Sequence, residues 1–231
     1  MKTIRLLKML ERMPLFTEND ISKITNKSQE YVRTLLYRLH KKGLIRRIEK
    51  GKYTVHEDEI IFASYIAKPS YLSLWTAFRH YNMTQQQPFS LFVMVPVARK
   101  AIKISNTEIL FSKTVHMFGY KKEKYSDFNI FMAEREKAII DAMLFRLPLQ
   151  DILEAINEET DYEKLASYAK RVANISLIKR LGYILKMRTG KSYGLKAMDN
   201  NYIPLDYLGK KKGKKDSYWK LIINHDNKER T

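Results

Sequence analysis

LHKKGLIRRIEKGKYTV, residues 39–55, contains the pattern that decides the fold of the N-terminal part of this 231-residue chain. A helix-type run ends at Gly43, a residue type common just past a helix C-terminus. Two runs of apolar and basic residues follow, 44–48 and 52–55, separated by the glycine-containing segment 49–51. Short runs rich in β-branched and aromatic residues around such a segment are typical of a β-hairpin. The stretch therefore predicts a helix followed directly by a hairpin with basic residues on its strands and at its tip.

Three helices are predicted before this hairpin, and the third ends where the hairpin begins. The first ends at Pro14 and has three apolar residues on one face, Ile4, Leu7 and Leu10. The second follows Thr17 and the third follows Ser28, and both residues are of types that favour helix N-caps. The third helix carries an apolar stripe at i, i+3, i+4 and i+7, formed by Val32, Leu35, Leu36 and Leu39. Three helices and a basic hairpin predict a winged helix-turn-helix over residues 1–56.

The outer face predicted for the third helix indicates a double-stranded DNA partner. An α-helix fits the major groove, and its N-terminal residues reach base edges first. We therefore expect contacts at or near the bases from Ser28, Gln29, Tyr31, Arg33 and Thr34. We expect contacts with phosphates from Arg38, Lys41, Arg46, Arg47, Lys50 and Lys52, while Lys27 and Tyr37 lie on the same predicted face. The alternative is that these polar residues only solvate the helix and the hairpin.

The charge of the chain also favours a polyanionic partner. Lys and Arg number 43 against 25 Asp and Glu, which gives a net charge of +18, and the excess gathers towards both ends of the chain. Such a balance favours nucleic acid or an anionic membrane surface, although a lysine-rich solvated surface is also compatible with it. No run of about 20 uncharged apolar residues is present, so no membrane span is predicted. The absence of cysteine excludes disulfides and thiol chemistry and fits a cytoplasmic protein.

Residues 57–231 are predicted to form a mixed domain with a small sheet and several helices, which makes the chain α+β. Apolar spacing indicates helices at 60–67, 70–81, 133–146, 151–157, 162–172 and 176–187. Short β-branched and aromatic runs indicate strands at 89–95, 101–104, 109–111, 115–119, 128–132 and 218–223. The basic segment near 209–217, which contains GKKKGKK, is interpreted as a solvated loop or as a second surface for anions.

Motifs for catalysis are absent from the sequence. The five histidines lie apart without the spacing of a metal site, and the eight glycines form no nucleotide-binding loop. No nucleophile elbow occurs. Lys137 and Asp141, four residues apart on one predicted helix, are expected to form an ordinary helix salt bridge. The sequence therefore predicts no catalytic residue, no metal ligand and no cofactor.

YLSLWTAFRHYNMTQQQPFSLFVMV, residues 71–95, combines a tryptophan with an arginine, a histidine and three consecutive glutamines. The helical spacing of Trp75 and Phe78 indicates a packed face rather than a catalytic pocket. This segment resembles the YLSLWSALRHHGLTEQ-P signature of the AbiEi family. Members of that family are transcriptional regulators on the antitoxin side of type IV (abortive infection) toxin–antitoxin systems.

Other blocks agree with this resemblance and follow in the same order. FSKTVHMFGY, FMAEREKAIIDAML and SLIKRLGYILK, at 111–120, 131–144 and 176–186, resemble later segments of the AbiEi family. LHKKGLIRRIEKGKYTV resembles the closing helix and wing of bacterial and archaeal winged-helix regulators, and the family has such a module at its N-terminus. The chain departs from the family pattern at residues 133–135, where Ala-Glu-Arg replaces Ala-Asp-Pro, and in its more basic tail.

The resemblance implies a two-part protein that is not an enzyme. Its winged helix-turn-helix would bind inverted repeats in its own promoter and act as an autorepressor. Its second part, from residue 57, would counteract a nucleotidyltransferase toxin without forming a stable complex with it. Two alternatives remain open. One is a transcriptional regulator whose second domain senses a ligand or mediates assembly, and the other is an enzyme with a winged-helix targeting module.

Overall fold

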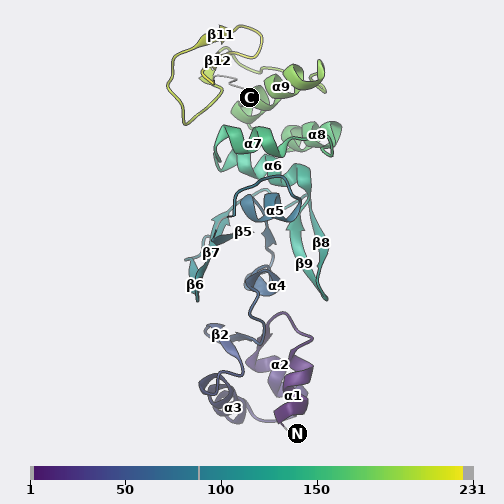
Figure 1. The fold of residues 1–231 in the computed structure, drawn as a ribbon, viewed down its shortest axis with the longest axis vertical. Helices are drawn as coiled ribbons and strands as arrows, with labels where there is room; N and C mark the ends of the chain where they lie inside the picture. The colour runs from purple at the N-terminus through teal and green to yellow at the C-terminus, as the bar shows by residue number, and fades with distance from the viewer. Residues whose placement is uncertain (1–2, 88, 226–231) are drawn as a thin grey trace. The chain divides into compact units, whose positions relative to one another are not determined.

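The computed structural model describes residues 3–87 and 89–225 and shows an α+β protein (Figure 1). These described residues form nine helices and three sheets. None of the helices in the described ranges is both long enough and apolar enough to cross a lipid bilayer. The fold class is the one predicted from the sequence.

The described residues divide into two compact units. The first unit contains residues 3–72 and 89–132, and the second contains residues 73–87 and 133–225. The segment 73–87 thus leaves the first unit and the chain returns to it afterwards. The domain boundary expected after residue 56 lies inside the first unit and stays a prediction.

The first unit begins with three helices and a small antiparallel sheet. The helices are α1 (Thr3–Leu10), α2 (Glu18–Thr25) and α3 (Gln29–Lys41), and the strands are β1 (Phe16–Thr17), β2 (Arg46–Glu49) and β3 (Lys52–Thr54). The strand order is β1-β3-β2, and β2 and β3 form the predicted hairpin, which we call the wing. We call α1–α3 and β1–β3 together the N-terminal module. Its arrangement is compatible with the predicted winged helix-turn-helix.

A continuous apolar core holds the N-terminal module together. Its buried side chains are Leu6, Leu10, Phe16, Ile21, Val32, Leu36, Leu39, Ile45 and Tyr53. The predicted stripe of α3 faces this core, with Leu35 partly buried at its edge. On α1 the prediction is wrong at one position, because Ile4 is 71% exposed while Leu6 is buried. Leu6 and Leu10 are four residues apart and therefore share the inner face of α1.

Polar side chains fix where α2 and α3 begin. The Thr17 hydroxyl accepts a hydrogen bond from the Asp20 amide at 3.3 Å, and the Asp20 carboxylate accepts one from the Thr17 amide at 2.8 Å. This reciprocal pair is a capping box, which satisfies two donors that the start of a helix leaves free. The Ser28 hydroxyl accepts a hydrogen bond from the Tyr31 amide at 3.4 Å and caps α3. Both predicted N-caps are confirmed.

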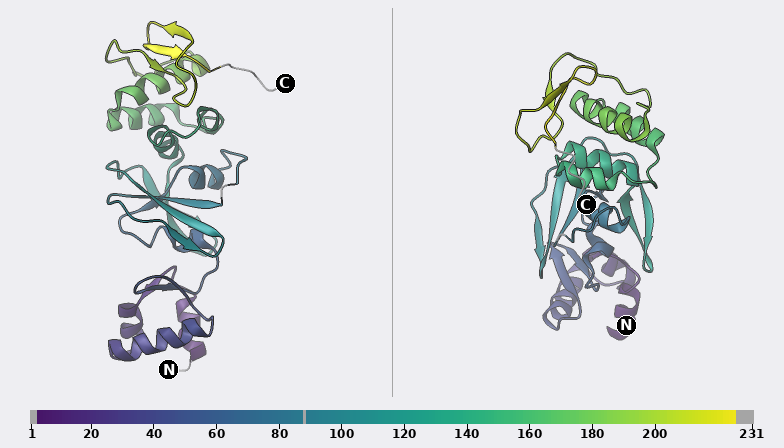
Figure 2. Two further views of the ribbon diagram at one scale, coloured as in Figure 1. Left: turned by 90° about the vertical axis from the view of Figure 1, so that its left-hand side faces the viewer. Right: turned by 45° about the horizontal axis from the view of Figure 1, so that its top comes forward.

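A six-stranded sheet completes the first unit (Figure 2). Its strands are β4 (Tyr71–Leu72), β5 (Ser90–Val95), β6 (Ile102–Ile104), β7 (Thr107–Lys113), β8 (Tyr120–Tyr125) and β9 (Phe128–Ala133). Their order is β6-β7-β5-β4-β9-β8, and the short helix α4 (Glu59–Ala63) precedes the sheet in the chain. The sheet is mixed, because β5 runs parallel to β7 and antiparallel to β4.

Two predicted elements near this sheet are wrong. The helix expected from residue 70 begins only at α5 (Trp75–His80), because the two residues of β4 pair with β5 instead. The strand expected at 115–119 does not form, and β8 follows at 120–125. The sequence of β8, YKKEKY, is too rich in lysine to give the apolar signal of a strand, so pattern reading placed the strand one segment early.

The second unit contains five helices and a three-stranded sheet within the described residues. Besides α5, the helices are α6 (Arg135–Leu144), α7 (Leu149–Ala155), α8 (Tyr162–Val172) and α9 (Ile175–Thr189). The strands are β10 (Ile203–Pro204), β11 (Lys214–Asp216) and β12 (Leu221–Ile223), in the order β10-β12-β11. Predicted helices match α6–α9 closely. The loop predicted at 209–217 is wrong in part, because β11 lies within this segment and pairs antiparallel with β12.

Asp141 on α6 is the centre of a buried polar network in the second unit. Its carboxylate pairs with the Lys137 ammonium and accepts a hydrogen bond from the Ser73 hydroxyl at 2.8 Å. The predicted pairing of Lys137 with Asp141 is present, and it lies in the core, since both side chains are 0% exposed. Burial lowers the pKa of Lys137 below its usual value, and the Asp141 carboxylate opposes this change. The network therefore joins α6 to Ser73, two residues before α5, through a hydrogen bond to a buried carboxylate.

Asp151 on α7 holds the segment 73–87 in a similar way. Its carboxylate accepts hydrogen bonds from the Trp75 indole at 3.1 Å and from the Gln86 amide at 2.9 Å. Burial raises the pKa of Asp151, and the hydrogen bond from Trp75 opposes this change. The tryptophan and one glutamine of the aromatic segment at 71–95 therefore have structural partners, which agrees with a packed face there.

Gly182 on α9 allows Trp219 to pack directly on that helix. A Cβ atom on Gly182 would lie 2.2 Å from two ring carbons of Trp219, which is far inside the contact distance of two carbons. The Trp219 side chain is 2% exposed and stands just before β12. This close approach fixes the three-stranded sheet on α9.

Asn in place of Asp141 tests the buried network. We expect Asp141→Asn to lower the free energy of unfolding by about 3–5 kcal/mol, because the Lys137 ammonium is left buried without its counter-ion. Urea unfolding followed by circular dichroism measures this loss. Asp127→Asn, at an exposed position, serves as the matched control and should change stability by less than about 0.5 kcal/mol. Equal effects of the two substitutions would contradict the role given to Asp141.

Candidate nucleic-acid interface

The outer face of α3 presents all the contact residues predicted for this helix and its N-terminal turn. The apolar stripe faces the core, so the polar residues between its members face outwards. All nine are exposed, namely Lys27, Ser28, Gln29, Tyr31, Arg33, Thr34, Tyr37, Arg38 and Lys41. Two of them are large aromatic side chains, since Tyr31 is 52% exposed and Tyr37 is 64% exposed. The fold therefore brings the predicted set together on one surface.

Contacts from α2 position the first turns of α3. The Gln29 amide donates to the Asn19 side chain at 3.2 Å, and the Arg33 guanidinium pairs with Glu18 at 3.0 Å. Both contacts are at the surface, where an ion pair contributes little to stability. They orient two of the predicted base-contacting residues, and a competing phosphate or base can replace either partner. The Ser28 hydroxyl has its acceptor role in the cap of α3 but keeps its own proton to donate.

A surface hollow opens beside the start of α3. Its volume is 360 Å³, and it is lined by Ser28, Glu30, Tyr31, Thr34, Leu35 and Arg38. Four of these residues belong to the predicted contact set. The hollow is thus part of the surface that a groove edge would meet.

The wing divides the four predicted basic residues into two pairs. Arg47 and Lys50 are exposed, and Lys50 lies in the turn between the strands. Arg46 and Lys52 are half-buried, and their cationic groups have partners inside the first unit. The sequence alone did not distinguish these two pairs. The partners of Arg46 and Lys52 lie on the facing strand or in later segments, and only the fold brings them close.

Arg46 ties the wing to the segment that follows it. Its guanidinium pairs with Glu59 on α4 at 3.1 Å and donates to the Glu57 carbonyl at 2.9 Å and to the Ser105 hydroxyl at 3.1 Å. These contacts use both terminal nitrogens of the side chain. Arg46 therefore has a structural role that its place in a basic run did not reveal.

Glu49 on β2 forms ion pairs with two further cations. Its carboxylate pairs with Lys52 at 2.8 Å and with Arg99 at 2.6 Å. Burial raises the pKa of Glu49, but the two cations outweigh it and leave the pKa below its usual value. Lys52 also donates to the Ile66 carbonyl. Because the folded-state pKa is depressed, these contacts contribute stability at neutral pH and lose it as the pH falls below about 4.5.

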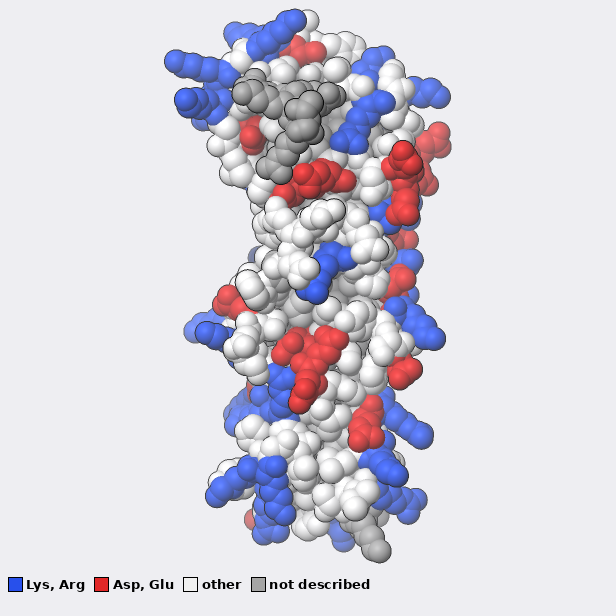
Figure 3. All heavy atoms as spheres, in the orientation of Figure 1, with Lys and Arg blue, Asp and Glu red and all other residues white. Residues whose placement is uncertain are grey.

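Basic side chains project from both ends of the chain in the face shown in Figure 3. Around β11 the exposed lysines are Lys210, Lys211, Lys212, Lys214 and Lys215. Other basic residues of this region have internal partners. Lys179 pairs with Asp199, and the Arg180 guanidinium donates to the Pro204 and Leu205 carbonyls. The second unit therefore has a lysine-rich edge of its own.

The described residues contain no group of three His, Asp or Glu side chains that could hold a metal ion. A scan against protein-family models finds no match, and a search of curated proteins finds no similar sequence.

Neighbouring arginines of the wing provide a test of this division. We expect Arg46→Gln to lower the free energy of unfolding by about 1.5–3 kcal/mol, because it removes charge-assisted hydrogen bonds to four partners, the Glu59 carboxylate, the His56 and Glu57 carbonyls and the Ser105 hydroxyl. Arg47→Gln, one residue away and exposed, should change it by less than about 0.5 kcal/mol. Urea titration of the two variants at neutral pH measures both values. A loss in Arg47→Gln as large as that in Arg46→Gln would show that the two arginines are equivalent.

Proposed function

We propose that the protein binds double-stranded DNA through the outer face of α3 and the exposed side of the wing. The observation that carries this proposal is that the nine residues predicted on α3 and in the turn before it are all exposed on one surface. A helix of 13 residues presents its first turns to base edges when it lies in a major groove. The net charge of +18 supplies the attraction to phosphate that such binding requires.

The contacts divide by chemistry and by availability. Gln29, Tyr31, Arg33 and Thr34 on the first turns of α3 are proposed to contact bases, because their side chains donate or accept in the geometry that groove edges offer. Arg38 and Lys41 further along the helix, with Arg47 and Lys50 on the wing, are proposed to contact phosphates. Arg46 and Lys52 are proposed to act as supports of the wing instead of direct contacts, since their cations already have partners.

The finer proposal is that the protein is an autorepressing antitoxin of the AbiEi type. It rests on the ordered blocks quoted above, and on the place that several of their residues have in the second unit. Ser73 of the first block bonds to Asp141 of the block around α6, so these two blocks are in direct contact. Trp75 and Gln86 of the first block bond to Asp151 on α7. In this proposal the DNA sites are inverted repeats in the promoter, and the functional partner is a nucleotidyltransferase toxin with no stable complex between the two.

A transcriptional regulator without a toxin partner is the second candidate. It is favoured by a pocket in the first unit, beside the wing, that has the size of a small-molecule site.

Salt titration of DNA binding tests the interface. With a labelled fragment from upstream of the gene, four phosphate contacts give a log–log slope of roughly −4 between affinity and salt concentration. Arg47→Gln should bring this slope closer to zero by about one, while Arg46→Gln, measured where it is folded, should leave the slope as it is. Fluorescence anisotropy gives both quantities. A slope near zero in the unaltered protein would contradict the phosphate contacts.

Co-expression tests the antitoxin proposal separately. A neighbouring nucleotidyltransferase gene, when expressed alone, should arrest growth, and this protein should restore it from an unrelated promoter. Because the second unit is proposed to counter the toxin, the double variant Arg38→Gln, Lys41→Gln should restore growth as well as the unaltered protein while failing to bind the promoter fragment. A neighbouring gene of another kind, or a toxin that still arrests growth, would favour the regulator without a toxin.

A further inference from the structure

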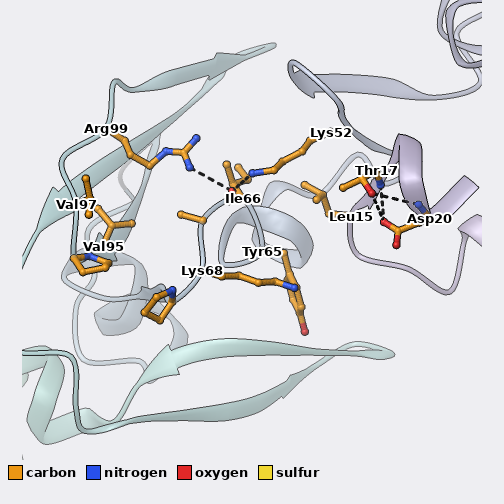
Figure 4. A pocket seen from close by; sticks show the side chains of 13 residues that line it. Leu15, Thr17, Asp20, Lys52, Tyr65, Ile66, Lys68, Val95, Val97 and Arg99 are labelled. Carbon is orange, nitrogen blue, oxygen red and sulfur yellow. Dashed lines mark hydrogen bonds between the residues drawn. The ribbon is translucent and has the colours of Figure 1, made fainter. Parts of the chain in front are cut away.

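A pocket of 490 Å³ lies in the first unit beside the wing (Figure 4). One side is formed by residues at the start of α2 and on β3, and the other by the segments 65–69 and 95–99. Its volume falls within the range of about 300–1,000 Å³ that small-molecule sites occupy. None of the residues predicted to contact bases lines it, so it is separate from the proposed DNA surface.

The walls of the pocket are mainly apolar. Leu15, Val95, Pro96 and Val97 contribute aliphatic surface, and Tyr65 adds an aromatic ring. Val95 is buried, whereas Val97 is 70% exposed and stands at the pocket's edge. A cavity with such walls favours a ligand with an apolar body, because the ligand then removes apolar surface from water on both sides.

Three cations face this apolar space, and their pairing leaves an excess of positive charge. Lys52 and Arg99 share the single negative charge of Glu49. The Lys68 ammonium lies 5.9 Å from the centre of the Tyr65 ring and has no acidic partner among the described residues. The acid in the lining, Asp20, is engaged in the capping box of α2. With Glu49 and Asp20 counted against the three cations, one positive charge is unmatched.

Two of the cations are already held in position. The Arg99 guanidinium donates to the Ile66 carbonyl at 3.4 Å and lies 5.1 Å from the centre of the Phe111 ring. Lys52 reaches the same carbonyl from the opposite side, as Figure 4 shows. A ligand anion therefore meets cations whose ordering cost has been met in the folded protein, which favours binding.

We propose that this pocket binds a small organic monoanion, a carboxylate with an apolar body. The carboxylate pairs with Lys68 and lies within the field of Arg99 and Lys52, and the apolar body fills the space between Leu15 and the valines. A neutral ligand of the same shape leaves the one positive charge of the pocket without a counter-charge. A dianion brings one negative charge more than the pocket can match. The pocket is thus selective for one negative charge as well as for size.

An occupant of this pocket contacts both the N-terminal module and the segments that flank the six-stranded sheet. On the module side it touches Thr17 and Asp20, which cap α2, and α2 in turn positions the first turns of α3 through Asn19 and Glu18. Occupancy should therefore change DNA affinity. This second step rests on the proposed function, whereas the binding of the anion does not.

Calorimetry with a matched pair of probes tests the site directly. The probes are 1-naphthaleneacetate and its uncharged amide, which have nearly the same shape. We expect the anion to bind at least about tenfold more tightly than the amide, and Lys68→Gln to remove most of this difference while leaving the amide unaffected. Lys124→Gln, at an exposed position on β8, is the control and should change neither affinity. Equal binding of the two probes, no binding of the anion at about 5 mM, or an equal loss in the control would overturn the proposal.

DNA binding measured with the anion at saturation tests the coupling. We expect the affinity for the promoter fragment to change by at least about threefold with the anion and to stay constant with the amide. Constant DNA affinity with the anion bound would overturn the coupling alone. A protein that binds the anion but no DNA would overturn the proposed function and leave the pocket assignment in place.

Discussion

The carboxylate of Glu49 determines how the basic residues of the wing are used. It pairs with Lys52 from its own hairpin and with Arg99 from a loop about 50 residues further along the chain. Two cations that are far apart in the sequence therefore share one carboxylate. Together with the pairing of Arg46 and Glu59, this fixes one side of the wing on the rest of the first unit. The other side keeps Arg47 and Lys50 exposed. Both the proposed DNA surface and the proposed pocket follow from this division.

Local signals in the sequence were sufficient for the three helices and the hairpin of the N-terminal module, but they missed β1 and the inward position of Leu6 on α1. Each of these signals concerns residues within a few positions of one another and specifies one element, namely the stripe on α3, the caps at Thr17 and Ser28, and the turn at Lys50 and Gly51. The same signals put the predicted α3 contacts on one face. They could not separate Arg46 from Arg47, because the partners that distinguish them, Glu59 and Ser105, are close only in the folded chain.

The six-stranded sheet and the sheet of β10, β11 and β12 were harder to predict for a related reason. The strands β4 and β10 have two residues each, and β8 and β11 consist largely of charged residues, so none of them shows an alternating apolar pattern. Their place is decided by pairing with β5, β9 or β12. The glycine in RLGY likewise gives no local signal of its purpose, which is the close approach of Trp219 to α9.

Three polar residues of the aromatic segment at 71–95 have structural partners in the second unit. Ser73 bonds to the buried carboxylate of Asp141, and Trp75 and Gln86 bond to Asp151. The Asp141 carboxylate also forms a buried charged pair with Lys137, which is costly to break, so the bond from Ser73 ties the segment to a stable part of the second unit. The second unit thus offers a fixed scaffold for the proposed action against a toxin.

Lysine labelling with and without DNA tests the central claim most directly, namely that one side of the wing and the outer face of α3 meet DNA. Acetylation rates at individual lysines are measured by mass spectrometry, in the free protein and with the promoter fragment bound. The account predicts that Lys27, Lys41 and Lys50 become protected, while Lys52, two residues from Lys50, keeps its rate. Unchanged labelling of Lys41 and Lys50, or protection of Lys52 together with Lys50, would contradict it.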